Sequence, residues 1–150
     1  MPKLELTELH HSLHRLAGAW TGTETIAPSP WDPEGATATA TVLNQIALDG
    51  SVLIQEYQQR RDDTVALEGH GVFGVEGTEV VLRWWDNWSP TPREFRGGVE
   101  GEVLELVSRD AKGGARATWH LGATEYRYTL EVPQGDGWYR YMEATYRRGT

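Results

Sequence analysis

The sequence predicts an all-β protein: a closed, ten-stranded antiparallel up-and-down barrel with one N-terminal helix plugging one end. From Ala19 onward, apolar and polar side chains alternate with a period of two, as in half-buried strands. The alternating segments are short, and turns of hairpin length separate them. No connection is long enough for a crossover, and closing the sheet is the simplest way to remove edge strands. A two-sheet sandwich, which would need a longer return connection, is the structural alternative.

Length and composition predict one domain over residues 1–150, with the helix at about 5–16 and the barrel at about 19–148. The 150 residues suffice for one core without disulfides or metals. The formal charge of -8 disfavours nucleic acids and anionic membrane surfaces as partners. The sequence has no cysteine, which excludes disulfides and thiolate sites. It shows no secretory pattern and no apolar run of membrane length, so we expect a cytoplasmic protein.

The predicted helix has one apolar stripe, built at steps of three and four residues from Leu6, Leu9, Leu13 and Leu16. Thr7 can cap its start and Gly18 can stop it. Because three turns are too few to be stable alone in water, the helix must dock on the barrel.

Three histidines lie on the same helix: His10, His11 and His14. His10 and His14 are four residues apart and could chelate a divalent ion. No third ligand stands at a telling spacing, and the zinc-protease pattern is absent. We therefore expect a solvated polar face and no metal site.

The ten strands are expected near residues 19–26, 36–47, 52–61, 65–75, 79–87, 93–99, 102–108, 115–121, 124–132 and 138–148. In an up-and-down barrel, alternate turns lie at opposite ends. The short turns at 49–50, 76–78, 100–101 and 122–123 then share one end with the helix. The mostly longer connections at 28–35, 88–92, 109–114 and 133–137, together with the short turn at 62–63, ring the other end. This asymmetry predicts a pocket with a single mouth.

The barrel interior is expected to be rich in aromatic side chains, because the chain has 7 Trp, 6 Tyr and 2 Phe. These rings either fill the lumen or line a ligand cavity. In the cavity interpretation, the lining and orienting residues are Trp20, Gln55, Tyr57, His70, Trp84, Tyr126, Tyr128, Tyr141 and Glu143. Trp31, between Pro30 and Pro33 in the longest mouth loop, is either a lid over the opening or a staple within the loop.

His70 stands between two glycines in Gly69-His70-Gly71. Glycines in a strand mark a bend, a bulge or a close backbone approach, and here they would leave room around the imidazole. An inward His70 could carry a proton, anchor a ligand or act as an axial metal ligand. The alternative is a hydrogen-bonded histidine on the outer face, and the alternation does not decide between them.

Trp84 and Trp85 are adjacent in a predicted strand and must point to opposite faces. We expect Trp84 inside and Trp85 outside. Asp86 would then face the lumen near the mouth, where it is paired with Arg83 or Arg96 or is available to a ligand.

Several motifs resemble known families. The segment Leu16–Gly22 resembles the opening Gly-x-Trp strand of the calycin superfamily, which includes lipocalins and fatty-acid-binding proteins. Together with Ser29–Pro33, Leu48-Asp49-Gly50, Gly69–Gly74, Trp84-Trp85-Asp86 and Met142–Arg148, it is similar to the bacterial domain-of-unknown-function family numbered 1579. That resemblance implies a lipocalin-like barrel but no catalytic residue.

A more distant resemblance is to nitrobindin, a ten-stranded haem barrel. Nitrobindins hold haem iron through a histidine on the last strand, and the segment Trp138–Arg148 has none. This departure counts against haem as a cofactor, since His70 would have to supply the axial ligand from another strand.

Three hypotheses for function follow. The first is a barrel that binds a small, largely apolar molecule in its lumen. The second is an acid–base enzyme of the isomerase or hydratase type that pairs His70 with Glu143 or Asp86, or a haem-binding variant that uses His70. The third is a structural homodimer with a filled barrel and an outer patch of Trp85, Trp138 and Met142. No hydrolase, nucleotide-binding or dehydrogenase motif is present, so an enzyme is less favoured than a binding protein.

Overall fold

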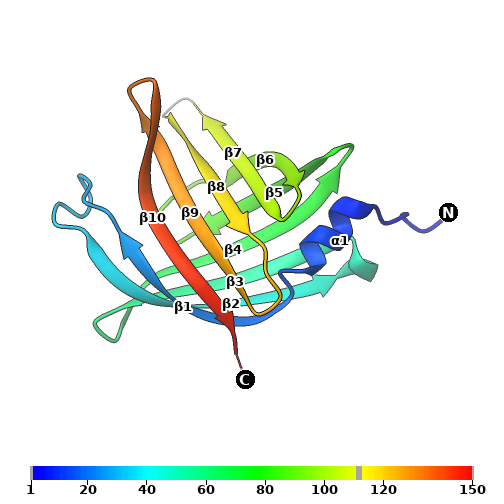
Figure 1. The fold of residues 1–150 in the computed structure, drawn as a ribbon, viewed down its shortest axis with the longest axis horizontal. Coiled ribbons are helices and arrows are strands. Elements are labelled where there is room, and N and C mark those ends of the chain that lie inside the picture. The colour runs from blue at the N-terminus through cyan, green and yellow to red at the C-terminus, as the bar shows by residue number, and fades with distance from the viewer. Residues whose placement is uncertain (1, 111–112, 150) are drawn as a thin grey trace.

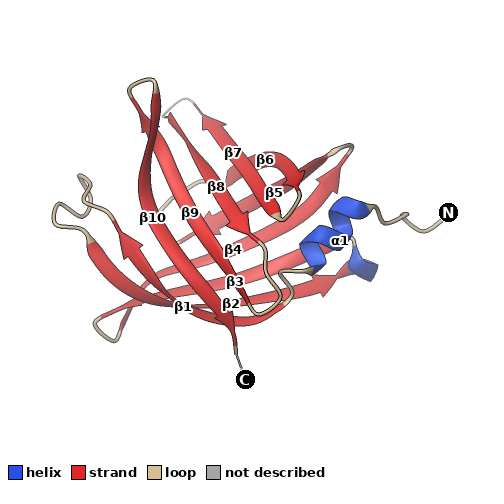
Figure 2. Cartoon of the chain, viewed as in Figure 1, coloured by secondary structure: helices blue, strands red, loops and turns tan. Residues whose placement is uncertain are grey.

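The computed structural model describes residues 2–110 and 113–149, and it shows a closed barrel (Figure 1). Within these residues, one α-helix precedes ten strands, and Figure 2 shows the helix beside the strands of the barrel. The elements are α1 (Glu8–His14), β1 (Gly18–Ile26), β2 (Ala36–Ala47), β3 (Val52–Arg61), β4 (Thr64–Glu76), β5 (Glu79–Asp86), β6 (Arg93–Glu100), β7 (Val103–Asp110), β8 (Gly113–His120), β9 (Glu125–Gln134) and β10 (Gly137–Arg148), with a short 3₁₀ turn η1 at Leu48–Gly50.

Each strand pairs antiparallel with its neighbour in the chain, and β1 pairs with β10 to close the sheet. The closing register runs from Trp20 opposite Arg148 to Ile26 opposite Met142. The predicted up-and-down barrel is confirmed, and every strand begins and ends within two residues of its predicted bounds. The α-helix is shorter than predicted, because the chain continues beyond His14 in 3₁₀-type turns. Arg15, Leu16 and Ala17 each donate a backbone hydrogen bond three residues back.

The helix lies across the end of the barrel that carries the short turns (Figure 1). Leu13 and Leu16 are buried in the same core cluster as Leu53 and Phe73. The Leu16 carbonyl accepts hydrogen bonds from Trp20 Nε1 and from Asn44 Nδ2, both at 2.8 Å. The helix is therefore fixed to β1 and β2 through one carbonyl, in addition to its apolar contacts.

Arg148 stabilises the helix end of the barrel through contacts outside the core. Its guanidinium carbon lies 4.2 Å from the Trp20 ring centroid, which is a cation–π distance. The same guanidinium donates to the carbonyls of Ala17 at 2.7 Å and Ala123 at 2.8 Å. The last strand thus holds the segment that joins the helix to β1.

The expectation of a solvated histidine face is wrong for His10, which is buried. Its Nδ1 accepts the backbone N–H of Thr7 at 2.9 Å, so a histidine takes the place of the usual Glu or Gln in a capping box. Burial, followed by the positive charges of His14 and His11, lowers the pKa of His10. His14 Nε2 instead contacts the Gly50 carbonyl at 2.8 Å. Within the described residues, no three His, Cys, Asp or Glu side chains gather as a metal site.

The docking of the helix predicts a clear stability difference between two leucines. Leu13→Ala should lower the free energy of unfolding by about 2–5 kcal/mol, because it leaves a cavity in the core beneath the helix. Leu4→Ala, at a position 67% exposed, should change it by less than about 0.5 kcal/mol. Urea denaturation measures both, and equal effects would show that the packing of the helix does not stabilise the barrel end that carries the short turns.

The buried His10 predicts a pH dependence with a defined sign. The folded state has the lower pKa, so the unfolded chain binds the proton more readily. The free energy of unfolding should therefore fall as the pH drops below about 6.5. His10→Gln keeps a capping side chain and should weaken this pH dependence, whereas His11→Gln, on the exposed face, should weaken it less, because the charge of His11 is the smallest of the three causes. Urea titrations at a series of pH values test this, and an identical pH dependence in His10→Gln would contradict it.

Candidate functional site

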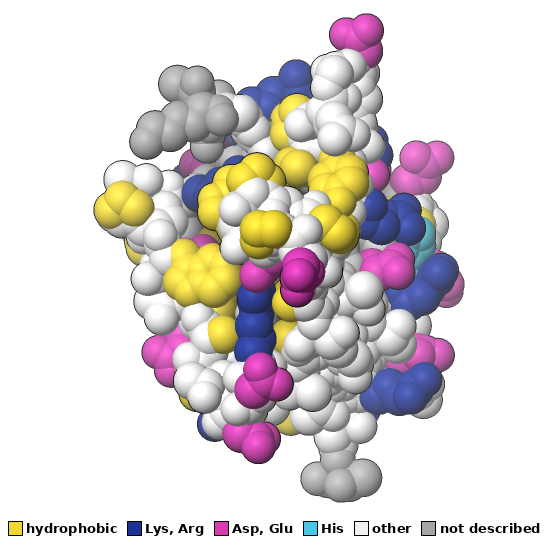
Figure 3. All heavy atoms as spheres, turned by 90° about the vertical axis from the view of Figure 1, so that its left-hand side faces the viewer, with side chains coloured by type: hydrophobic (Ala, Val, Ile, Leu, Met, Phe, Trp, Pro, Cys, Tyr) yellow, Lys and Arg dark blue, Asp and Glu magenta, His cyan; other side chains and the backbone are white. Residues whose placement is uncertain are grey.

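A cavity of about 330 Å³ lies inside the barrel between the core at the helix end and the opposite mouth. Small and flexible inward side chains on β8, β9 and β10 leave this space: Ala115, Ala117, Leu130 and Met142. The rim includes Trp31, Asp86, Trp88 and Arg93. Figure 3 looks onto the mouth end, where hydrophobic side chains gather between charged ones. The loop asymmetry thus corresponds to an internal space with one open end.

Aromatic rings form much of the cavity wall. The pairs Tyr57–Trp84, Trp119–Tyr128 and Tyr126–Tyr146 have centroids 5.8, 5.1 and 5.0 Å apart. The cavity is lined by six of the residues expected there: Gln55, Tyr57, Trp84, Tyr126, Tyr128 and Tyr141. Trp20 also faces inward, but it packs on Tyr126 at 4.7 Å in the base and does not line the cavity.

The two glycines beside His70 leave space for the Trp84 ring and not for the imidazole, contrary to the prediction. A Cβ at Gly69 would lie 2.1 Å from the Trp84 ring, and one at Gly71 would lie 3.1 Å from it. The glycines therefore face inward, where they let the indole lie against β4. Their neighbour His70 must then face outward.

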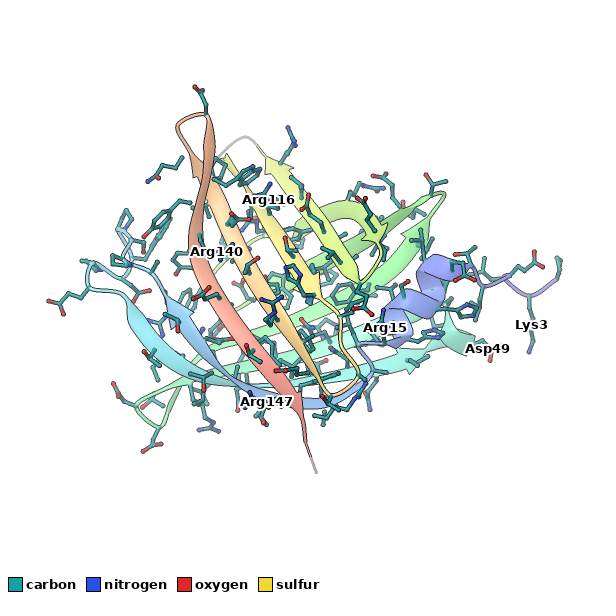
Figure 4. All side chains as sticks on the ribbon, in the orientation of Figure 1. Lys3, Arg15, Asp49, Arg116, Arg140 and Arg147 are labelled. Atoms are coloured by element: carbon teal, nitrogen blue, oxygen red, sulfur yellow. The ribbon has the colours of Figure 1, made fainter. Side chains whose placement is uncertain are left out.

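His70 and Glu143 lie outside the barrel, so the expectation that they orient a lumen ligand is wrong. His70 Nδ1 is 2.5 Å from Glu56 Oε1 on the adjacent strand. Glu143 lies on the outer face of β10, where its Oε2 is 3.5 Å from Nη1 of Arg140. Figure 4 labels Arg140 on this strand. The register shift between Arg140 and Met142 explains the error on β10. It lets Tyr141 reach the mouth while Met142, rather than Glu143, occupies the wall.

Asp86 faces the mouth as expected, but its partners differ from the predicted arginines. It accepts hydrogen bonds from Trp84 Nε1 at 2.8 Å and from the backbone N–H groups of Trp88 and Ser89, both at 2.9 Å. Arg83 and Arg96 instead pair with Glu76 and Glu94 on the outer face. His70, Glu143 and Asp86 therefore do not converge, and the proposed acid–base pairs are not formed.

The predicted outer patch of three apolar residues is not formed either. Trp85 is exposed and lies 6.0 Å from the His70 ring. Trp138 lies under the Arg116 guanidinium at 4.8 Å. Met142 is buried and lines the cavity. The strand alternation therefore separates the three side chains.

Sequence reasoning missed Glu24, a carboxylate that is completely buried behind the tyrosines of the cavity wall. The single hydroxyl hydrogen of Tyr57 is shared between both Glu24 oxygens, which lie 2.6 and 2.8 Å from the hydroxyl oxygen, and Gln59 Nε2 donates at 2.8 Å. Tyr146 donates to the second oxygen. The signal was present in the alternation, since Glu24 lies two residues from Ile26 and four from Trp20, on the same face.

The local structure favours this carboxylate cluster. Gly22 lies opposite Tyr146 in the register, and a Cβ there would be 2.7 Å from the Tyr146 ring. The glycine lets the tyrosine reach across β1 to Glu24. Burial, with the nearby negative charge of Glu24, raises the pKa of both Tyr57 and Tyr146. Both hydroxyls thus remain protonated and donate to the carboxylate.

Polar contacts extend from this cluster to the mouth. Gln59 Oε1 accepts from Arg61 Nε at 3.0 Å, and Arg61 pairs with Asp32 at 2.7 Å. Asp32 belongs to the loop that carries Trp31, whose ring is 72% exposed and 6.1 Å from Tyr141. The loop is thereby tied to the barrel beside the opening.

A second concavity, of about 1030 Å³, lies on the outer face of β1, β2, β9 and β10. Its lining includes outward threonines and arginines, among them Thr21, Thr39, Thr41, Arg127 and Arg147. It is larger than the internal cavity, but it lies on the outer face of the sheet, and threonine and arginine side chains make up much of its lining. We therefore take the internal cavity as the candidate site.

Comparison with known proteins places the chain in a family. A model described as a protein of unknown function (DUF1579) matches residues 5–148. The chain belongs to this family. This match confirms the family resemblance seen in the sequence motifs.

No curated protein matches this DUF1579 protein in sequence. No helix in the described part of the chain has the length and apolar character to cross a membrane.

Solved structures with the same barrel fold are distant in sequence. Rv2717c from M. tuberculosis has 17% identity and a TM-score of 0.76, over 97% of this chain and 100% of that one. A mutant of the fluorescent protein UnaG has 14% identity and a TM-score of 0.56, over 92% and 99%. EF1p2_mFAP2b, solved bound to DFHBI, has 14% identity and a TM-score of 0.53, over 94% and 99%. At these identities the similarity shows the fold alone.

The buried carboxylate predicts unequal effects of removing two tyrosine hydroxyls. Tyr146→Phe removes a donor from Glu24 and should cost about 1–3 kcal/mol in the free energy of unfolding. Tyr126→Phe is a matched control, because the Tyr126 hydroxyl has no hydrogen bond to any described residue, and it should cost less than about 1 kcal/mol. Chemical denaturation compares the two, and equal costs would contradict the assigned hydrogen bonding.

Proposed function

We propose that this DUF1579 protein binds a small, largely apolar molecule inside its barrel. The observation that carries the proposal is the internal cavity of about 330 Å³, with apolar and aromatic walls and an opening at the mouth. This volume is at the lower end of ligand pockets and suits a molecule of one or two rings. Burial of apolar area against the rings would supply most of the affinity.

The polar groups of the wall would orient such a molecule. The hydroxyls of Tyr126 and Tyr128 face a common cavity and have no hydrogen bond to a described residue. Burial raises the pKa of both, so they remain neutral and can donate or accept. The DFHBI complex of EF1p2_mFAP2b, a barrel of similar fold, supports a small aromatic guest as a reasonable occupant.

Haem ligation through His70 is not part of the proposal. His70 lies on the outer face beside Glu56, and no histidine is among the described residues that line the cavity. The axial ligand that the haem hypothesis requires, His70, is therefore outside the cavity. The proposal is restricted to an organic guest held by the apolar and aromatic wall.

A fluorescent probe tests the proposed function directly. N-phenylnaphthylamine should become brighter on binding and saturate at one site per chain. Ala117→Phe, which fills the cavity from β8, should abolish this signal, and so should Ala115→Leu if the first variant is unstable. Trp85→Ala, on the outer face, should leave it unchanged. Binding that persists in both filled variants would place the probe elsewhere and contradict the proposal.

A further inference from the structure

We propose that the cavity selects ligands that carry a protonated amine, with Glu24 as the countercharge and the Tyr57 and Tyr146 hydroxyl oxygens as the contact atoms. This inference rests on the proposed function and names the chemical class of the ligand. It concerns one end of the cavity, where a buried carboxylate lies behind two tyrosines of the wall.

Glu24 is surrounded by neutral donors. Its three hydrogen-bonding partners, Tyr57, Gln59 and Tyr146, carry no charge. Among the described residues, no arginine, lysine or histidine forms an ion pair with it. Three donors converging on two oxygens match an ionised carboxylate. A negative charge is thus fully buried without a countercharge in contact, which is costly unless a cation is held nearby.

The hydrogen-bond directions determine what the wall offers to a ligand. Tyr57 and Tyr146 use their hydroxyl hydrogens on Glu24, and both side chains line the cavity. The Tyr57 oxygen also accepts from Gln59 Nε2 at 3.2 Å, and the lone pairs that remain on the two hydroxyl oxygens can only accept. A ligand at this position must therefore donate a hydrogen bond. An ammonium group meets that demand with three donors, whereas a carboxylate offers none.

The aromatic lining favours a cation in the same way. The faces of tyrosine and tryptophan rings carry a negative quadrupole, and a cation among several rings is stabilised. Tyr57, Trp84, Trp119, Tyr128 and Tyr146 all line this cavity. In a low-dielectric interior, the Glu24 charge acts on a ligand cation through the intervening hydroxyl groups without direct contact.

The positive groups of the cavity lie toward the mouth, and in the described residues none of them forms an ion pair with Glu24. Arg61 is connected to the carboxylate only through Gln59. Arg61 pairs with Asp32 on the mouth loop. Arg93 begins β6 at the same end, with its guanidinium 5.4 Å from the Phe95 ring. A ligand carboxylate could lie only near these arginines, whereas an amine can reach the interior.

Three probes with one ring system separate the effect of charge from that of apolar burial. Naphthylmethylamine is a cation at neutral pH, naphthylmethanol is neutral and naphthoate is an anion. Isothermal titration calorimetry of the wild-type protein should show the amine binding about tenfold more tightly than the alcohol, since a hydrogen bond to a charged group supplies that difference. Naphthoate should bind more weakly than both.

Glu24→Gln tests the origin of this preference. The substitution keeps the size of the side chain and removes its charge, so the amine should lose about tenfold in affinity while the alcohol changes by less than about threefold. Glu143→Gln is the matched control, because it removes a carboxylate from the outer face, and it should preserve the preference. Unchanged alcohol binding by Glu24→Gln would also show that the cavity is intact.

The outcomes distinguish this inference from the proposed function. If the alcohol binds but the amine shows no advantage, or if the advantage survives Glu24→Gln, the amine inference is wrong and the proposed function stands. If Glu24→Gln does not fold, Tyr146→Phe provides the same test, because it removes one acceptor oxygen and should weaken amine binding selectively. If none of the three probes binds the wild-type protein, both proposals are wrong.

Discussion

The pairing of β1 with β10 is the constraint on which the remaining structure depends. Closure of the sheet gives every strand one inner and one outer face, so each side chain is committed to one of two very different environments. On β1 this places Glu24 in the interior with Trp20 and Ile26. An interior carboxylate must be satisfied by hydrogen bonds, and Tyr57, Gln59 and Tyr146 provide them. The buried polar cluster is therefore a direct consequence of closure.

The hollow interior results from an unequal distribution of side-chain volume. At the helix end, the barrel holds a core cluster that includes the buried side chains of Leu13, Leu16, Trp20 and Phe73. Toward the mouth, alanines on β8 and glycines on β4 face inward instead, and the rings of Trp84 and Trp119 stand at the wall rather than in the centre. Protein interiors tolerate few empty spaces of this size without a function. A ligand is the simplest account of a lumen that is packed at one end and open at the other.

Much of this fold could be predicted from the sequence, because alternation and turn chemistry are local signals. The strand bounds, the helix position and the inward direction of Trp84 all follow from them. The site was harder to predict where a choice depended on neighbouring strands. His70 and Trp84 compete for the space that Gly69 and Gly71 provide, and only the pairing of β4 with β5 shows that the indole takes it. The register shift in β10 is equally invisible in the local pattern, and Glu24 was overlooked because a charged residue is rarely expected inside.

The most direct test of the hollow barrel is a crystal structure of the protein soaked with iodobenzene, whose iodine can be located by anomalous scattering. An apolar cavity of this kind accepts small aromatic guests without rearrangement. The account predicts a strong iodine peak inside the barrel, between Ala117, Leu130 and Tyr57. An interior closed by side chains, with iodine found only on the outer surface, would contradict it.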